Sequence, residues 1–205
     1  NYIHSVVEEV VVQASLLGQT EDGISDPLHI LDGAEIADMA TTSLGETLDS
    51  LAGVTTADYG SAVGQPILRG LSGLRVKVLT NGLVNRDVAG IGADHKNEVD
   101  LFDIQQVEVV RGPSSLLYAN GASGGIVNLV DNSIATSDLE EMSFKLGFET
   151  QSVNSGDSQN FAYSDNVGGL NLYFSYSDYA FGNYDIPNGA VLHEDCLLYT
   201  SDAAD

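Results

Sequence analysis

The chain has 205 residues, of which 30 are acidic and only 7 are basic, so its formal net charge is −23 at pH 7. Such acidity argues against nucleic-acid binding, because neutralising phosphates requires clustered Lys and Arg. No apolar run approaches the roughly 20 residues of a membrane-spanning helix. The opening NYIHSVVEE has neither the basic start nor the apolar core of a signal peptide. The chain is therefore expected either to be cytosolic or to have lost its beginning.

The basic residues are confined to one part of the chain. Only Lys145 lies outside the interval from residue 69 to residue 111. The others are Arg69, Arg75, Lys77, Arg86, Lys96 and Arg111. A solvated surface would scatter such residues, so we expect this interval to meet acidic groups elsewhere in the molecule.

The first part of the chain changes from a polar segment to an ordered one. Residues 1–23 are polar apart from a short β-prone patch, EEVVVQAS, and are expected to be extended and flexible. Residues 28–39, LHILDGAEIADM, predict a short strand, a turn at Asp32 and Gly33, and a turn of helix.

A short helix is predicted in residues 43–53, SLGETLDSLAG. Ser43 and Glu46 form an S-x-x-E capping box, in which each side chain satisfies a backbone N–H at the start of the helix. One apolar face is formed by Leu44, Leu48 and Leu51. Gly53 suits the position just beyond the helix, where a left-handed backbone is common.

The middle of the chain reads mainly as strands. VTTADY and QPILRGL precede RVKVLTNGLVN, in which Asn81-Gly82 is a strong signal for a two-residue hairpin turn. A polar loop, residues 86–100, leads to the strand VEVVR, a helical turn with Pro113 at its first position, and the strand GIVNLV. One small helix-and-strand domain, from residue 24 to about residue 130, accounts for this pattern.

Beyond Asp131 the hydrophobic pattern changes to alternation. In residues 143–149, Phe and Leu alternate with polar residues and glycine, and residues 170–177 repeat the alternation with aromatics. Such strands are typical of an outer-membrane β-barrel, although a soluble antiparallel sheet alternates in the same way. Two or three strands cannot close a barrel, so a barrel would require a longer chain.

One motif raises an enzymatic alternative. GASGG, residues 121–125, matches G-x-S-x-G and would make Ser123 a hydrolase nucleophile. That elbow needs a strand before the serine and a helix after it, whereas here a helical turn precedes and a strand follows. We therefore disfavour a hydrolase.

Three stretches resemble TonB-dependent outer-membrane receptors. LRGLSGLRVKVLTNG at residues 68–82 and VEVVRGPSSLLYANGASGGIVN at residues 107–128 match the plug domain, and EEVVVQA at residues 8–14 matches the TonB box. The two longer motifs are specific, because several spaced Arg, Gly and Pro positions match together. The resemblance covers residues 8 to about 190.

This resemblance implies an architecture and a location. Residues 24–135 would be an α+β plug domain with a small mixed sheet and short helices, and residues 136–195 would begin a transmembrane β-barrel, truncated here, of the 22-stranded class. The barrel would lie in the lipid of the bacterial outer membrane, with the plug in its lumen. No catalytic residue and no cofactor are expected, because transport requires no covalent chemistry.

The resemblance also implies a partner for the N-terminal segment. The periplasmic energy-coupling protein TonB would bind the TonB box by adding it as a β-strand. The residues concerned are Glu9, Val10, Val11, Val12, Gln13 and Ala14.

Two plug arginines are expected to contact the barrel. Arg69 and Arg111 stand in similar R-G contexts and would face acidic residues on the inner barrel wall. A buried arginine left without a partner would cost about 3–5 kcal/mol. The alternative, which we rank second, is that both arginines end exposed strands.

The polar loop carries the residues from which we predict the cargo. Asp94 and His95 combine a carboxylate with an imidazole, which are first-choice ligands for Zn²⁺, although two ligands make only half a site. DH in this loop is similar to the zinc-importing branch of the family, which implies these two residues as plug ligands. His193, Glu194 and Asp195 would be early-capture ligands in an extracellular loop. The cargo predicted from the sequence is thus zinc or another divalent metal.

Three alternatives remain open at this stage. A ferric siderophore is the rival cargo within the same family, and its sites do not need Asp94 and His95. A signalling receptor would carry an extra folded domain before the TonB box. The serine hydrolase is the third alternative.

The last ten residues, 196–205, have a separate explanation. CLLYTSDAAD resembles the translation of a transposase adapter used to prepare sequencing libraries, so we leave this segment, with the sole cysteine, out of the fold prediction.

Overall fold

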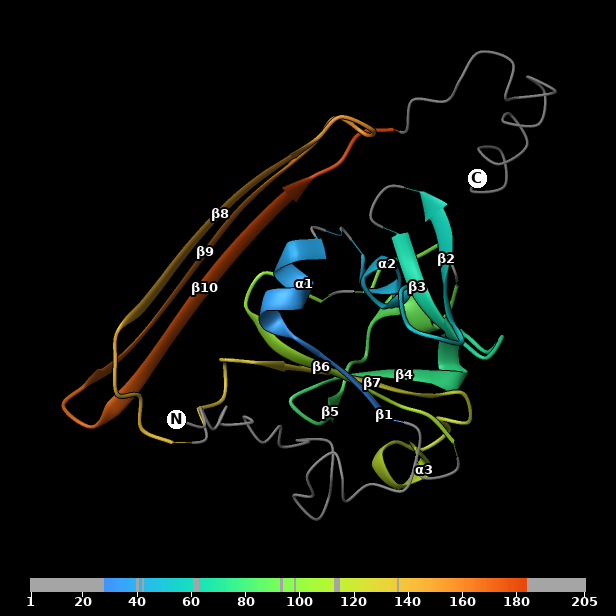
Figure 1. Cartoon of the computed structure of the whole chain (residues 1–205), viewed down its shortest axis with the longest axis horizontal. Coiled ribbons are helices and arrows are strands. Elements are labelled where there is room, and N and C mark those ends of the chain that lie inside the picture. The colour runs from blue at the N-terminus through green and yellow to red at the C-terminus, as the bar shows by residue number, and fades with distance from the viewer. Residues whose placement is uncertain are drawn as a thin grey trace, which may run out of the picture.

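The computed structural model describes residues 28–183 apart from residues 40, 42, 61, 62, 93, 98, 113, 114 and 136. Figure 1 shows a small α+β unit and, beside it, a long curved sheet of three strands. The two units follow each other in the chain.

A five-stranded mixed sheet forms the centre of the α+β unit. Its strands, in spatial order, are β1 (Leu28–Asp32), β6 (Ile104–Val110), β7 (Gly125–Asp131), β4 (Val76–Thr80) and β5 (Leu83–Val84). β4 and β7 pair in parallel, and all other neighbours are antiparallel.

Both faces of this sheet are covered. On one face lie α1 (Gly33–Met39), α2 (Leu44–Leu48) and a separate hairpin of β2 (Val54–Gly60) and β3 (Val63–Leu68), and on the other lies α3 (Ser115–Tyr118) (Figure 1). Single 3₁₀ turns, η2 (Gly73–Arg75) and η3 (Val88–Gly90), flank the β4–β5 hairpin. β7 is buried along nearly its whole length and β6 from Val107 to Val110. The two buried polar side chains on these strands are paired, because Asn128 Nδ2 donates a hydrogen bond to Glu108 Oε2 at 2.9 Å.

The predicted cap of α2 is present, but its predicted end is wrong. Ser43 Oγ accepts a hydrogen bond from Glu46 N at 3.2 Å, and Leu44 and Leu48 are fully buried in the core. The helix ends at Leu48, several residues earlier than expected, because backbone bonds of two successive tight turns carry the chain directly into β2. Gly53, at φ +76°, therefore serves the turn before β2 and not the helix terminus.

Two predicted turns have different outcomes. Asn81 and Gly82 both have positive φ, +49° and +79°, which confirms the type I′ hairpin between β4 and β5. The turn predicted at Asp32 and Gly33 is instead a direct passage from β1 into α1. There the Asp32 carboxylate accepts a hydrogen bond from Glu35 N at 2.8 Å and caps the helix.

The long sheet contains β8 (Ser143–Gln151), β9 (Gly156–Val167) and β10 (Leu170–Ala180), all antiparallel. Its apolar side chains alternate with polar ones, as predicted. The face away from the α+β unit exposes Phe144, Leu146, Phe148, Leu170, Leu172, Phe174 and Tyr176. Ring contacts across the strands, Phe144–Phe161 at 5.3 Å and Phe161–Phe174 at 5.6 Å between centroids, reinforce this band.

The predicted fold class is confirmed: a plug-like mixed sheet with few short helices precedes the open antiparallel strands of a partial barrel. Among the described residues, no helix is long and apolar enough to cross a membrane.

Candidate functional site

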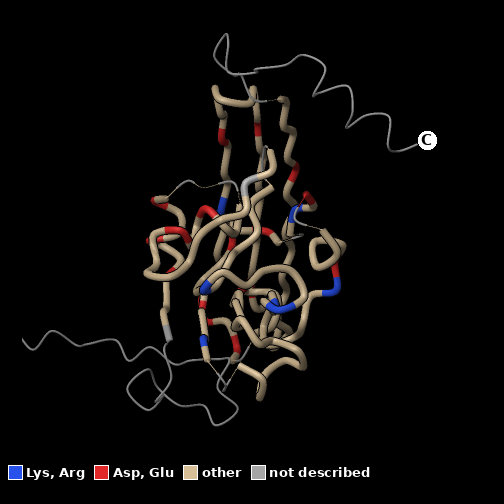
Figure 2. Tube along the Cα trace, turned by 90° about the vertical axis from the view of Figure 1, so that its right-hand side faces the viewer, with Lys and Arg blue, Asp and Glu red and all other residues tan. Residues whose placement is uncertain are grey.

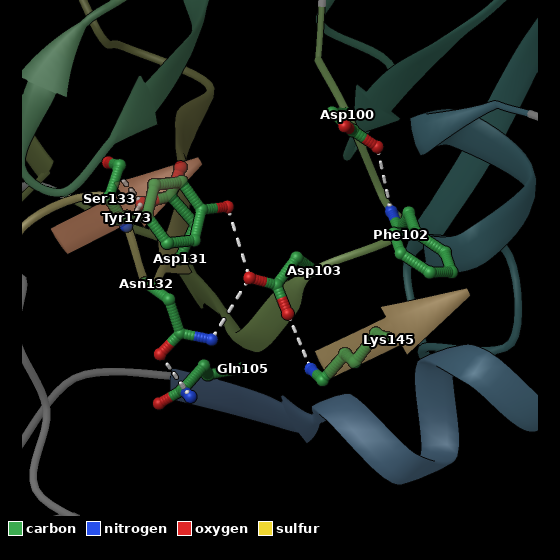
Figure 3. Close-up of polar contacts among 9 residues, drawn as sticks. All are labelled: Asp100, Phe102, Asp103, Gln105, Asp131, Asn132, Ser133, Lys145 and Tyr173. Carbon is green, nitrogen blue, oxygen red and sulfur yellow. Dashed lines mark hydrogen bonds and ion pairs between the residues drawn. The ribbon is translucent and has the colours of Figure 1, made fainter. Parts of the chain in front are cut away.

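The contact between the two units is concentrated in residues 100–103, immediately before β6. Asp103 is 6% exposed, and its carboxylate forms an ion pair with Lys145 Nζ of β8. It also accepts hydrogen bonds from the Tyr173 hydroxyl of β10 at 3.0 Å and from Asn132 Nδ2 at 3.1 Å (Figure 3). One carboxylate thus joins two of the long strands to the segment after β7.

Asp100 makes a second polar connection nearby. It accepts hydrogen bonds from the Ser177 hydroxyl at 2.5 Å and the Tyr179 hydroxyl at 3.0 Å, both on β10. A third bond, from Phe102 N at 2.9 Å, fixes the turn between the two aspartates (Figure 3). We call residues 100–103 with these strand partners the aspartate seam.

An aromatic contact completes the aspartate seam. A Cβ built on Gly147, in the middle of β8, would lie 2.4 Å from the Phe102 ring. The ring therefore occupies the space that a side chain at position 147 would need. Beside the seam, a cavity of about 1000 Å³ separates α1 and residues 96–105 from β8 and β9, so the two units are not tightly packed throughout.

The charges at the aspartate seam have the opposite sign to the predicted contact. We expected plug arginines to face acidic wall residues, whereas here plug aspartates face a lysine and hydroxyl groups of the strands. Figure 2 shows most basic positions on the α+β unit and mainly acidic positions on the long strands. The contact predicted for Arg69 and Arg111 with acidic residues of the barrel wall stays a prediction.

Arg111 has a role inside the α+β unit. It is 6% exposed, its Nη1 donates to the carbonyl of Ala52, and its Nη2 contacts Nε2 of His29. Its Nε has no partner among the described residues. Burial and, secondarily, the positive charge of Arg69 lower the pKa of Arg111. Arg69 itself is exposed at the end of β3, with a positive φ of +51°. Two guanidinium groups thus share one corner of the unit.

The predicted metal ligands are adjacent but form an incomplete site. His95 Nδ1 lies 3.6 Å from Asp94 Oδ1, and the two side chains are 44% and 70% exposed. In the part of the chain that the structure describes, no group of three or more His, Cys, Asp or Glu residues could hold a metal. His193, Glu194, Asp195 and the TonB-box residues 9–14 lie outside the described residues.

One buried residue of this region escaped the sequence analysis. Gln65, in β3, is 3% exposed, and its Nε2 reaches three backbone carbonyls of the polar loop. A single glutamine beside Pro66 carries no distinctive sequence signal, because the three carbonyls lie 24 to 30 residues further along the chain.

The elements on either side of Ser123 follow the order that disfavours a hydrolase. The α3 helix precedes it and β7 follows it, which is the reverse of a nucleophile elbow.

Comparisons with known proteins agree with this architecture. The family profile described as the TonB-dependent Receptor Plug Domain matches residues 21–126. The vitamin B12 transporter BtuB of Vibrio vulnificus is 30% identical over 135 residues, which cover 63% of this chain and 22% of that protein. This chain thus spans about a fifth of the length of that relative.

Solved structures show the same fold at low identity. The ferric-catecholate import receptor Fiu from E. coli K12 superposes with a TM-score of 0.60 at 16% identity, covering 78% of this chain and 22% of that one. The siderophore receptor PirA from Acinetobacter baumannii superposes with a TM-score of 0.56 at 18% identity, covering 73% of this chain and 24% of that one. With the profile match extending over half of its residues, the chain belongs to the TonB-dependent receptor plug-domain family.

Proposed function

We propose that this chain is the plug and the first barrel strands of an outer-membrane receptor that takes up a metal chelate, foremost a ferric siderophore. The proposal differs from the cargo that the sequence favoured, free zinc. It is supported by relatives whose names are those of a vitamin B12 transporter and of siderophore receptors. Zinc is less favoured because Asp94 and His95 supply only two ligands.

The aspartate seam is the observation that carries the proposal of transport. A permanent contact between two units would be expected to be large and apolar. Here it consists of hydrogen bonds, one ion pair and the contact of the Phe102 ring with Gly147, beside a cavity of about 1000 Å³. Polar contacts of this kind can be exchanged for water, so a plug held by them can shift without exposing an apolar core.

The proposed setting follows from the exposed faces. The apolar band on β8–β10 would face lipid of the outer membrane, and the aspartate seam would lie in the lumen. TonB would engage residues 9–14 from the periplasm by strand addition. Pulling on this segment would be transmitted to the central sheet through β1, the first strand of the described residues.

Uptake of labelled cargo tests the proposal. The full-length receptor is expressed in a bacterial strain without competing receptors, with and without TonB, and supplied with ⁵⁵Fe-loaded tris-catecholate or with ⁶⁵Zn²⁺. We expect TonB-dependent accumulation of ⁵⁵Fe that disappears when residues 9–14 are deleted. Accumulation of neither label would contradict uptake of these cargoes.

Zinc uptake remains a second candidate because Asp94 and His95 are neighbouring and exposed. Accumulation of ⁶⁵Zn²⁺ that is lost in His95→Ala would favour zinc over the chelate. The matched control is Lys96→Ala, which changes the next, exposed residue of the same loop and removes no carboxylate or imidazole.

A further inference from the structure

The polar loop between β5 and β6 is held by one side chain from another element. Gln65 Nε2 lies 2.8 Å from the Ala89 carbonyl, 2.7 Å from that of Gly92 and 2.6 Å from that of His95. Three carbonyls spread over seven residues therefore converge on one amide nitrogen.

Other contacts that keep this shape are few among the described residues of the loop. They are the 3₁₀ turn η3, the buried side chain of Ala89 and the backbone bond from His95 N to Gly92 O at 3.3 Å. Ile91 and Asp94, by contrast, are 83% and 70% exposed. The amide of Gln65 therefore adds a connection from three loop carbonyls to β3.

The number of donors makes this connection sensitive to substitution. A primary amide has two N–H groups, so three carbonyls share two hydrogens. A side chain without N–H groups would leave these three carbonyls without this donor. A carboxylate at position 65 would also place a negative charge against the partial negative charges of the three carbonyl oxygens. A side chain of the same size as glutamine but without N–H donors therefore cannot replace it.

The loop lies beside β3 and presents several exposed side chains. β3, which carries Gln65, stands on the face of the central sheet opposite α3 (Figure 1). Exposed groups of mixed chemistry, an isoleucine, a carboxylate and an imidazole, lie together on this loop. A preformed loop loses less entropy when it binds than a loop that must first be ordered.

We propose that Gln65 is a positioning residue that, through the carbonyls of Ala89, Gly92 and His95, holds this loop in the shape in which it contacts the imported solute. This inference rests on the proposed uptake function. Gln65 touches no solute and acts through the three carbonyls.

The test compares variants of the full-length receptor in detergent. Gln65→Met keeps the shape of the side chain without donors, Gln65→Glu replaces the donors by acceptors, and Gln159→Met on the exposed face of β9 is the matched control. Hydrogen exchange of amides in residues 89–97 measures the loop, and binding of ferric tris-catecholate measures the function.

We expect Gln65→Met to exchange faster in the loop but not in β6 or β7, and to bind the chelate about tenfold more weakly, the effect of about one lost hydrogen bond. Gln65→Glu is expected to lose more affinity, and Gln159→Met none. If Gln65 only fills space, Gln65→Met should behave like the wild type, because methionine has a similar size. Wild-type exchange or wild-type affinity in that variant would overturn the inference.

Two further outcomes can be interpreted: a Gln65→Met variant that does not fold, and a wild-type receptor that binds no chelate. If Gln65→Met does not fold, Gln65→Asn keeps an amide that is one methylene too short to reach all three carbonyls, and the same exchange and affinity changes are expected. If the wild-type receptor binds no chelate, the proposed function fails with the solute-contact part of the inference. Loop exchange then decides the connection through Gln65 alone.

Discussion

Replacing Asp103 by alanine should loosen the long strands from the plug. The substitution removes the acceptor of three donors: Lys145 Nζ, the Tyr173 hydroxyl and Asn132 Nδ2. The Lys145 side chain is 45% exposed, so water screens its ion pair with Asp103. Loss of this pair should therefore cost at most about 1 kcal/mol. Tyr173 and Asn132 are partly buried, and loss of each of their hydrogen bonds to Asp103 should cost about 1 kcal/mol. The expected loss in free energy of unfolding is therefore about 3 kcal/mol.

Urea unfolding in detergent micelles measures this loss. Unfolding is followed by circular dichroism, because the sequence has no tryptophan for fluorescence. Asp103→Asn keeps one carbonyl acceptor and should cost about 1 kcal/mol. Asp178→Ala, an exposed carboxylate on β10, is the matched control and should cost less than about 0.5 kcal/mol. An Asp103→Ala variant as stable as this control would refute the reasoning.

Three further substitutions test other contacts. Gly147→Val should cost about 1–3 kcal/mol because its Cβ meets the Phe102 ring, and a double-mutant cycle with Phe102→Ala should recover part of that loss. Gly53→Ala, at φ +76° and with a Cβ 3.1 Å from Arg111 Nη1, should lower stability by at least about 1 kcal/mol in thermal unfolding, and an unchanged midpoint would contradict the packing described. Asn81→Val places a β-branched residue at φ +49° and removes the hydrogen bonds of the Asn81 side chain with Asp131 and Ser133. It should therefore cost at least about 1–2 kcal/mol in urea, and a neutral effect would argue against both the type I′ turn and these bonds.

Local structure could be predicted where neighbouring residues decide it. The type I′ turn at Asn81 and Gly82, the cap at Ser43 and the alternation in β8–β10 depend on residues within a few positions of one another. The end of α2 was predicted wrongly, because the backbone bonds that close the following turns outweigh the preference of Gly53 for a helix terminus.

The sequence by itself therefore determined the elements, the plug-like order and the family resemblance, since spaced motifs and periodicity are properties of the chain. Only the tertiary structure decided which polar groups meet. Asp103 pairs with Lys145 across 42 residues and with Tyr173 across 70, and Gln65 reaches carbonyls up to 30 residues away. Such contacts depend on how the sheets are placed against each other, because a carboxylate or an amide will bond to whichever complementary group the fold brings within reach.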